Sequence, residues 1–566
     1  MKMSKANSSL DPITLEIIFN ALRSVADETF ITLMKSAYST NIKERRDHST
    51  AIMDKYGRLI VQADASLPVH LASMGGLMVS LLKKYKGNIF PGDIFIGNDP
   101  HVAGGTHLPD INMAMPLFFE GQLIAFMCNI AHHADVGGSV PGSMAGGMTE
   151  IFQEGIRLPV TRLFEAGELQ ADIMELILLN VRIPEERRGD YYAQIASCRL
   201  GTTRLSELIE NYGITQLNNS FDEIIHRTKK RMKEAIIEIP DGIYEFSDIM
   251  DDDGMGTLEI PICVSIMVKN DYILFDFTGT ADQVTGNINV TLNATQASVC
   301  YALKALLDPD VPNNQGVLDL PEIIVKKGSL LDAQFPAPVA ARANTCQRII
   351  DVILGALAKA KPEAAVAAAN GANTTAVFSG INPSTGVSYV YLETLGGGFG
   401  GRATKDGKDG VQVHITNTSN LPVEAIEMEY PLMVHSYKLI EDSGGAGRNR
   451  GGLGLERIIE PIKHDCTFNG AGERFENQPW GIFGGEDGKS GEFIKVDKSG
   501  KASRLNNKPI AIEVKENESI VIRTPGAGGY GPAKEREIKD ISADAVNKKF
   551  SYNFLEKKYP QWKNGT

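Results

Sequence analysis

The fold of this chain is decided by residues 107–135, which read HLPDINMAMPLFFEGQLIAFMCNIAHHAD. Two apolar runs flank a turn signal at Gly121, so we expect two antiparallel strands within residues 111–131. Asp110 lies 11 residues before Gly121 and His132 lies 11 residues after it, so a regular antiparallel ladder places these two residues side by side. The hairpin therefore predicts that a carboxylate and an imidazole meet at its open end.

Histidines are concentrated around this hairpin. Six of the ten histidines lie between His48 and His133. Histidine suits both metal ligation and proton transfer, so this clustering indicates where the chemistry occurs. The sharpest part combines His107 and Asp110 with His132, a set that a hard-to-borderline divalent ion prefers. From the residues alone, two interpretations stay open: a metal site, or a group of hydrogen-bonded loop residues.

A further carboxylate, Asp47, lies just before the first predicted hairpin in the run Glu44-Arg45-Arg46-Asp47-His48. A carboxylate among mixed charges is more often part of a surface ion pair, so spacing alone favours that interpretation over ligation. Glycines flank the central hairpin at residues 104–105 and 137–147, where they would let loop backbone fold closely over a site.

Hydrophobic periodicity predicts an α+β fold, rich in β-structure, with N-terminal helical segments and antiparallel hairpins around the candidate metal site. We expect three regions: an N-terminal α+β region with the metal site (1–240), a β-rich, glycine-rich region packed on it (241–533), and a peripheral tail (534–566). Charged runs at residues 185–188 and 229–231 are interpreted as solvated helix faces. The expected helices are 12–38, 74–85, 298–307 and 348–360, with more helix in 172–239, and the expected hairpins are 51–61, 111–131 and 262–277.

Composition excludes several classes of protein. The 566 residues include 57 basic and 70 acidic side chains, giving a formal charge of −13, which argues against a nucleic-acid or anionic-membrane partner. No run of 18 apolar residues, no signal-peptide pattern and no Cys-x-x-Cys pair occurs, so we expect a soluble protein of the reducing cytoplasm. Glycine is enriched, with 56 residues or about 10% against the ~7% of average usage, which we interpret as loops and tight turns that shape a pocket.

Several nucleotide and calcium motifs fail on inspection. Gly-x-Gly-x-x-Gly occurs at residues 396–401 and 526–531, but neither copy opens a helix, as a dinucleotide-binding fingerprint must. Residues 488–490 lack the first glycine of a P-loop, and residues 251–254 do not fit the register of an EF-hand. The chain therefore offers a candidate metal site and no recognisable nucleotide site.

Longer motifs resemble the hydantoinase B/oxoprolinase family over nearly the whole chain, to about Pro532. The stretches that carry the resemblance are ERRDHS (44–49), LPVHL (67–71), PGD (91–93), NDP (98–100), GGTHLPD (104–110), AHHADVGG (131–138), PGSM (141–144), EG (154–155), RRGD (187–190), DFTG (276–279), GGGFG (396–400), DSGGAG (442–447) and TPGAGGYG (524–531).

This resemblance implies a B-type subunit of an ATP-dependent enzyme that opens cyclic amides, such as a hydantoinase, oxoprolinase or caprolactamase. A separate A-type subunit would use ATP to phosphorylate the substrate within a heterotetramer or larger complex, and the B-type subunit would complete the reaction. The family's metal ligands fall on Asp47, His107, Asp110 and His132 of this sequence, with zinc or manganese expected and iron as an alternative. His107, Asp110 and His132 would then be the catalytic residues.

Two neighbouring side chains are expected to support these ligands. Because strand residues alternate faces, His133 should point away from His132 and serve a supporting or structural role. Asp135 is expected to orient a ligand imidazole, the usual outer-shell role of a carboxylate.

The functional hypothesis is that a metal-activated water attacks a phosphorylated lactam or hydantoin passed from the partner subunit. Two alternatives stay open: a B-type subunit of an acetone or acetophenone carboxylase, and a subunit whose metal only orders the fold. The chain has little sequence beyond the shared core, which favours the hydrolase over the carboxylase.

Overall fold

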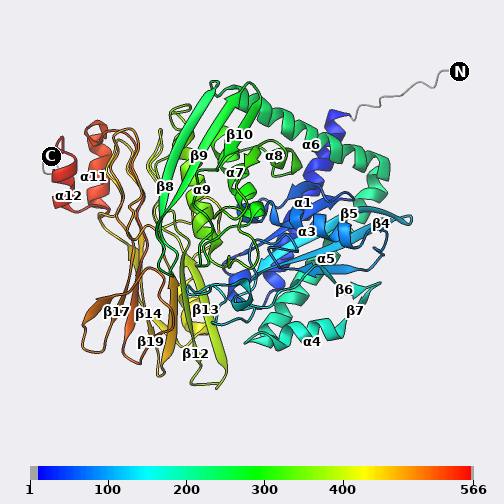
Figure 1. Cartoon of the computed structure of the whole chain (residues 1–566), viewed down its shortest axis with the longest axis horizontal. Coiled ribbons are helices and arrows are strands. Elements are labelled where there is room, and N and C mark those ends of the chain that lie inside the picture. Colours follow the sequence, from blue (N-terminus) through cyan, green and yellow to red (C-terminus); the bar gives the residue numbers. More distant parts are fainter. Residues whose placement is uncertain (1–10, 563–566) are drawn as a thin grey trace.

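A computed structural model describes residues 11–562 and has the predicted α+β architecture (Figure 1). Helix α1 (Pro12–Ser36) begins after Asp11, whose carboxylate accepts a hydrogen bond from the backbone N–H of Thr14. This N-cap and the proline at the first helical position are the local signals that start the helix.

The first sheet has seven strands in the order β2-β1-β5-β4-β3-β6-β7. It pairs β4 with β5 as the sequence predicts: Asp110 lies opposite His132, and a bulge near Leu117 adjusts the register next to the turn. Helices α1 and α5 cover one face through Ile52 and Met127, and α3 covers the other through Met53. The strands are β1 (His48–Asp54), β2 (Leu59–Gln62), β3 (Ile94–Gly97), β4 (Asp110–Phe119), β5 (Gln122–His132), β6 (Thr161–Glu165) and β7 (Glu168–Leu169).

Helices of the N-terminal half follow the predicted pattern closely. They are α2 (Thr40–Lys43), α3 (Ser73–Lys84), α4 (Ala171–Leu179), α5 (Pro184–Tyr212) and α6 (Ile214–Ile237). Within the charged run 185–188, however, Arg187 is only 1% exposed, so the expectation of a solvated helix face is wrong for this residue. Its guanidinium lies 3.2 Å from the carboxylate of Asp190, one turn further along α5.

A four-stranded sheet, β11-β10-β9-β8, lies beside the first sheet (Figure 1). Helices α7 and α9 pack between the two sheets, and every residue of α9 is buried. One hydrophobic cluster therefore joins residues before and after residue 240. The elements are β8 (Gly242–Asp252), β9 (Leu258–Lys269), β10 (Tyr272–Asp276), α7 (Leu292–Leu307), α8 (Gln315–Leu318), β11 (Glu322–Ile324) and α9 (Arg342–Leu357).

Two more sheets, β13-β12-β16-β19 and β14-β15-β20-β17-β18, pack face to face around Phe468 and Phe493. The C-terminal helices lie against loops of this part (Figure 1), where Leu555 and Trp562 share a hydrophobic cluster with Leu453. The elements are β12 (Thr374–Ile381), β13 (Ser388–Leu395), α10 (Val423–Glu429), β14 (Leu432–Leu439), β15 (Leu455–Pro461), β16 (Cys466–Ala471), β17 (Glu492–Val496), β18 (Ala502–Arg504), β19 (Ile512–Val514), β20 (Ser519–Arg523), α11 (Ile538–Val546) and α12 (Tyr552–Lys558).

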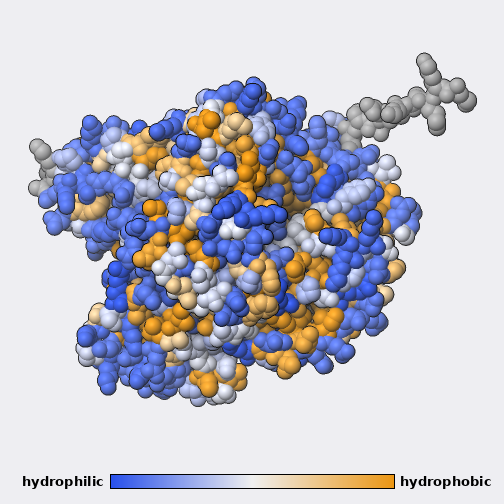
Figure 2. Space-filling model, in the orientation of Figure 1, coloured by the Kyte–Doolittle hydropathy of each residue, from blue (hydrophilic) through white to orange (hydrophobic). Residues whose placement is uncertain are grey.

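The surface mixes hydrophobic and hydrophilic residues, with mostly hydrophilic residues at the margins of the face in Figure 2. Between residues 11 and 562, no helix is both long and apolar enough to cross a lipid bilayer.

Direct backbone packing accounts for much of the glycine enrichment. Segments 396–401, 444–454, 481–491 and 525–531 lie against one another, joined by hydrogen bonds such as that from the Gly401 N–H to the Gly528 carbonyl oxygen at 2.9 Å. A Cβ on Gly451 would lie 1.9 Å from the carbonyl oxygen of Ala527, and one on Gly528 would lie 2.0 Å from that of Trp480. Both dinucleotide look-alikes belong to this cluster, and a Cβ on most of their glycines would overlap neighbouring backbone.

We predict that Gly451→Ala destabilises the protein by about 3 kcal/mol, because the added methyl overlaps backbone that cannot rotate away. Gly75→Ala is the matched control, since a Cβ there meets nothing within 4 Å and lies in α3. Alanine should leave stability unchanged there or raise it by up to about 1 kcal/mol. Chemical denaturation of both variants checks this, and equal effects would contradict the packing argument.

Candidate metal centre

Three ligand-type side chains meet at the open end of the β4–β5 hairpin. One ligand atom each from His107, Asp110 and His132 lies within 4.8 Å of the others, and all three residues are buried. Asp110 begins β4 and His132 ends β5, so the ladder itself brings them together. His107 lies three residues before Asp110, in the loop that leads into β4.

The His107 ring has a defined tautomer. Its Nδ1 lies 3.0 Å from the carbonyl oxygen of Ala340, which can only accept, so the ring proton is on Nδ1. Nε2 then carries a lone pair and no proton, and it lies 3.2 Å from Oδ1 of Asp110. Neither atom has a hydrogen-bond partner within residues 11–562. Two buried acceptors that face each other repel, so this pair fits a shared cation.

Charge at the centre favours the same interpretation. Burial, together with the nearby guanidinium of Arg342, lowers the pKa of His107, which keeps the ring neutral. Burial would raise the pKa of Asp110, but the Arg342 guanidinium opposes this effect, and the pKa of Asp110 lies well below its usual value. Arg342 donates to Oδ2 of Asp110 at 2.6 Å, leaving Oδ1 as the free, charged oxygen.

His132 is held by Asn41 of α2. The Asn41 amide nitrogen lies 2.9 Å from Nδ1 of His132 and 2.6 Å from its carbonyl oxygen. Nε2 of His132 lies 3.3 Å from the sulfur of Met144. Burial holds the pKa of His132 well below its usual value, so this imidazole is neutral as well.

Asp47 lies outside the three-residue group but lines the same hollow, together with His70, Asp110 and His132. Its side chain is buried and not part of a surface ion pair, and its carbonyl oxygen accepts a hydrogen bond from the backbone N–H of His132 at 2.9 Å. Burial raises the pKa of Asp47, opposed by Arg45 and His70. The hollow, about 20 Å³, has room for about one water molecule.

The two expected supporting residues do different things. His133 points away from the centre, as predicted: it packs against Tyr191 at 4.5 Å between ring centroids, and its Nε2 lies 3.0 Å from the side-chain oxygen of Gln194. Asp135 accepts hydrogen bonds from the backbone of Gly137 and Gly142 and from Arg182. In the described part of the chain it contacts no ligand imidazole, so it orders the glycine loop that follows the hairpin.

Sequence reasoning missed several residues of the site. His70 lies 3.6 Å from Oδ1 of Asp110, and its signal was present, because it belongs to the histidine cluster. Arg342 gave no signal, and Glu154 appeared only in the EG stretch of the family resemblance, with no role assigned to it. Glu154 accepts hydrogen bonds from the N–H groups of Val339 and Ala340, the residue whose carbonyl holds His107. Part of the wall comes from residues far along the chain: Asn373, Leu392, Thr394, Ile415 and Thr416.

Comparison with known proteins identifies the family of this chain. The model of the family described as hydantoinase B/oxoprolinase matches residues 11–533. The chain belongs to this family. It is 32% identical to the B-type subunit of a putative D-/L-hydantoinase from a Pseudomonas strain, over 96% of this chain and 94% of that protein.

Solved structures share the fold. The ATP-dependent caprolactamase of Pseudomonas jessenii matches with a TM-score of 0.93 and 26% identity, covering 99% of this chain and 97% of that one. An acetone carboxylase matches with a TM-score of 0.89 and 18% identity, covering 97% of this chain and 79% of that one. At that identity, the second likeness concerns the fold alone.

We predict that the purified protein carries about one divalent ion per chain, and that His107→Ala reduces this content close to zero. Losing Nε2 leaves Asp110 without its facing ligand. His226→Ala, an exposed histidine on α6, is the control and should keep the metal. Mass spectrometry of digested protein measures the content, and full retention in His107→Ala would contradict the assignment.

Glu154 should affect metal affinity indirectly. Glu154→Leu removes the acceptor that holds the 339–340 backbone, so metal affinity should fall about 10- to 100-fold, as for other outer-shell partners. Glu154→Gln keeps a side-chain oxygen for both N–H groups and should bind nearly as well as the wild type. Competition with a chromogenic chelator measures both affinities, and equal losses in the two variants would argue against this role.

Proposed function

We propose that this chain is the B-type subunit of an ATP-dependent cyclic amide hydrolase, acting on a substrate that an A-type partner subunit has phosphorylated. Family membership supports this proposal, as do the relatives named as a B-type hydantoinase subunit and a caprolactamase. The structural feature of this chain that supports the proposal is the buried pair of acceptors, His107 Nε2 and Asp110 Oδ1, beside His132.

The reaction benefits from a division of labour. An amide is a poor electrophile because the nitrogen lone pair is delocalised into the carbonyl. Phosphorylation of the oxygen removes this delocalisation and makes the carbon open to attack by water. The adduct would then break its C–N bond, with the ring nitrogen taking up a proton, to give a ring-opened acyl phosphate. A second water would release phosphate from that acyl phosphate and leave the carboxylate. A divalent ion held by His107, Asp110, His132 and Asp47, whether zinc, manganese or iron, would lower the pKa of water towards ~7 and stabilise negative charge on oxygen.

The protein's own residues would prepare the site for this step. Arg342 and Thr106 fix Asp110 through its Oδ2, and the Ala340 carbonyl fixes the His107 ring. Leu67, Leu392 and Ile415 line the hollow with apolar surface, which excludes bulk water and strengthens electrostatic interactions. The hollow is smaller than a hydantoin ring, so lining residues must move for substrate to enter. Met144 is one of these lining residues, and it lies in the glycine-rich segment 142–147.

A carboxylase subunit is the second candidate, favoured by the fold shared with acetone carboxylase. Both reactions would begin with phosphorylation by a partner, but the carboxylase would join a phosphorylated enol to activated carbon dioxide or bicarbonate. Sequence identity is 26% to the caprolactamase and 18% to the acetone carboxylase, which supports the hydrolase proposal.

Reconstitution with the A-type subunit distinguishes these activities. We expect ATP cleavage to be stimulated by a cyclic amide among hydantoin, 5-oxoproline and caprolactam, with ring-opened product formed. His107→Ala should lower product formation at least about 10³-fold, since it removes a ligand of the ion that activates water. Stimulation only by acetone or acetophenone with bicarbonate would replace the hydrolase with the carboxylase.

The third possibility, a metal that only orders the fold, makes a different prediction for the same variant. The melting temperature of His107→Ala would then fall together with its activity. We expect a catalytic ion to be lost with only a modest change in melting temperature, which differential scanning calorimetry measures on the same samples.

A further inference from the structure

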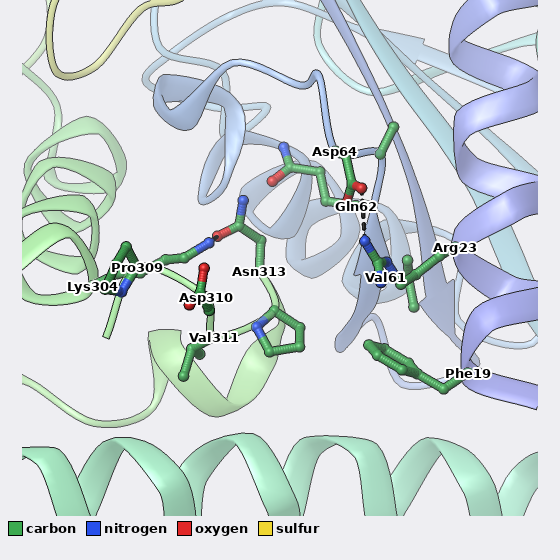
Figure 3. A pocket seen from close by; sticks show the side chains of 12 residues that line it. Phe19, Arg23, Val61, Gln62, Asp64, Lys304, Pro309, Asp310, Val311 and Asn313 are labelled. Atoms are coloured by element: carbon green, nitrogen blue, oxygen red, sulfur yellow. Dashed lines mark hydrogen bonds and ion pairs between the residues drawn. The ribbon is translucent and has the colours of Figure 1, made fainter. Parts of the chain in front are cut away.

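A second pocket lies between α1, strand β2 and the segment that follows α7 (Figure 3). It shares no lining residue with the hollow at the candidate metal centre. Its volume is about 260 Å³, enough for a small organic molecule. The lining residues are Phe19, Arg23, Val61, Gln62, Ala63, Asp64, Lys304, Pro309, Asp310, Val311, Pro312 and Asn313.

Gln62 is the decisive residue of this pocket. Its side chain is only 5% exposed, and neither its amide nitrogen nor its amide oxygen has a hydrogen-bond partner in the described chain. Figure 3 shows this carboxamide reaching from β2 into the space that faces Asn313. Leaving a buried donor and acceptor unpaired is unfavourable by about 1–3 kcal/mol for each group, and native proteins rarely tolerate it without a function.

Charged groups of both signs face the same space. The Lys304 ammonium donates to the side-chain oxygen of Asn313 at 2.9 Å and forms no ion pair within residues 11–562. Burial lowers the pKa of Lys304, opposed by nearby carboxylates that include Asp64 and Asp310. Arg23 is already paired with Asp64 at 2.7 Å, so Lys304 is the cation available to a ligand.

We propose that this pocket binds a free α-amino acid. An α-amino acid carries an ammonium and a carboxylate on the same carbon, close enough together to match the unpaired acceptor and donor of the Gln62 carboxamide. Lys304 would pair with the ligand carboxylate and Asp310 with its ammonium. Phe19 and Pro312 offer apolar surface to the ligand side chain. This site is independent of the function proposed for the metal centre.

Calorimetric titration of the full-length protein with the standard L-amino acids tests this proposal. We expect at least one to bind, and its decarboxylated amine and deaminated acid to bind at least about tenfold more weakly, because each loses one charged contact. Gln62→Leu and Lys304→Met should each raise the dissociation constant about 10- to 100-fold. Lys230→Met, which changes an exposed lysine of α6, should not.

Thermal melting without ligand separates binding from a structural role. Gln62→Leu removes two unpaired buried groups, so it should melt at the same temperature as the wild type or higher. If this variant does not fold, Lys304→Met alone decides the binding test. The proposal is overturned if no amino acid binds the wild type, or if the decarboxylated amine and the deaminated acid bind as tightly as the amino acid. It is also overturned if Lys304→Met binds the amino acid as tightly as the wild type does.

Discussion

The pairing of Asp110 with His132 at the open end of one hairpin is the constraint on which the site depends. Strand β1 pairs with β5 on the other side, and His48 lies opposite Ala131, so Asp47 is carried to the end of the same ladder. The backbone hydrogen bond from His132 to Asp47 continues that ladder by one step. Ordinary sheet geometry thus gathers residues from two distant segments at one buried point.

The N-terminal sheet alone does not complete the site. Helix α9 begins beside it, and there Ala340 fixes the tautomer of His107 while Arg342 neutralises one oxygen of Asp110. These contacts span more than 200 residues of sequence. Glu154 in turn holds the backbone around Ala340. The unpaired lone pairs that face each other are therefore positioned by both halves of the chain, which share one core.

Sequence reasoning located the hairpin and three of its side chains because apolar runs, a glycine turn and histidine spacing are local signals. It could not assign a role to Arg342 or Glu154, because those roles depend on what lies beside each residue in space. Charge pattern misled at Arg187 and Asp47, because ion partners and burial are tertiary properties. Composition detected the glycine enrichment, but its cause lies in contacts such as that between Gly451 and Ala527, far apart in sequence.

Anomalous X-ray diffraction from crystals of the purified protein, recorded at the absorption edges of zinc, manganese and iron, tests the central claim most directly. The account predicts one strong peak between Nε2 of His107 and Oδ1 of Asp110, about 2.0–2.2 Å from each if the ion is zinc, with His132 also within ligand distance. Well-ordered density for a water molecule and no anomalous peak between these atoms, in protein that retains its activity, would contradict it.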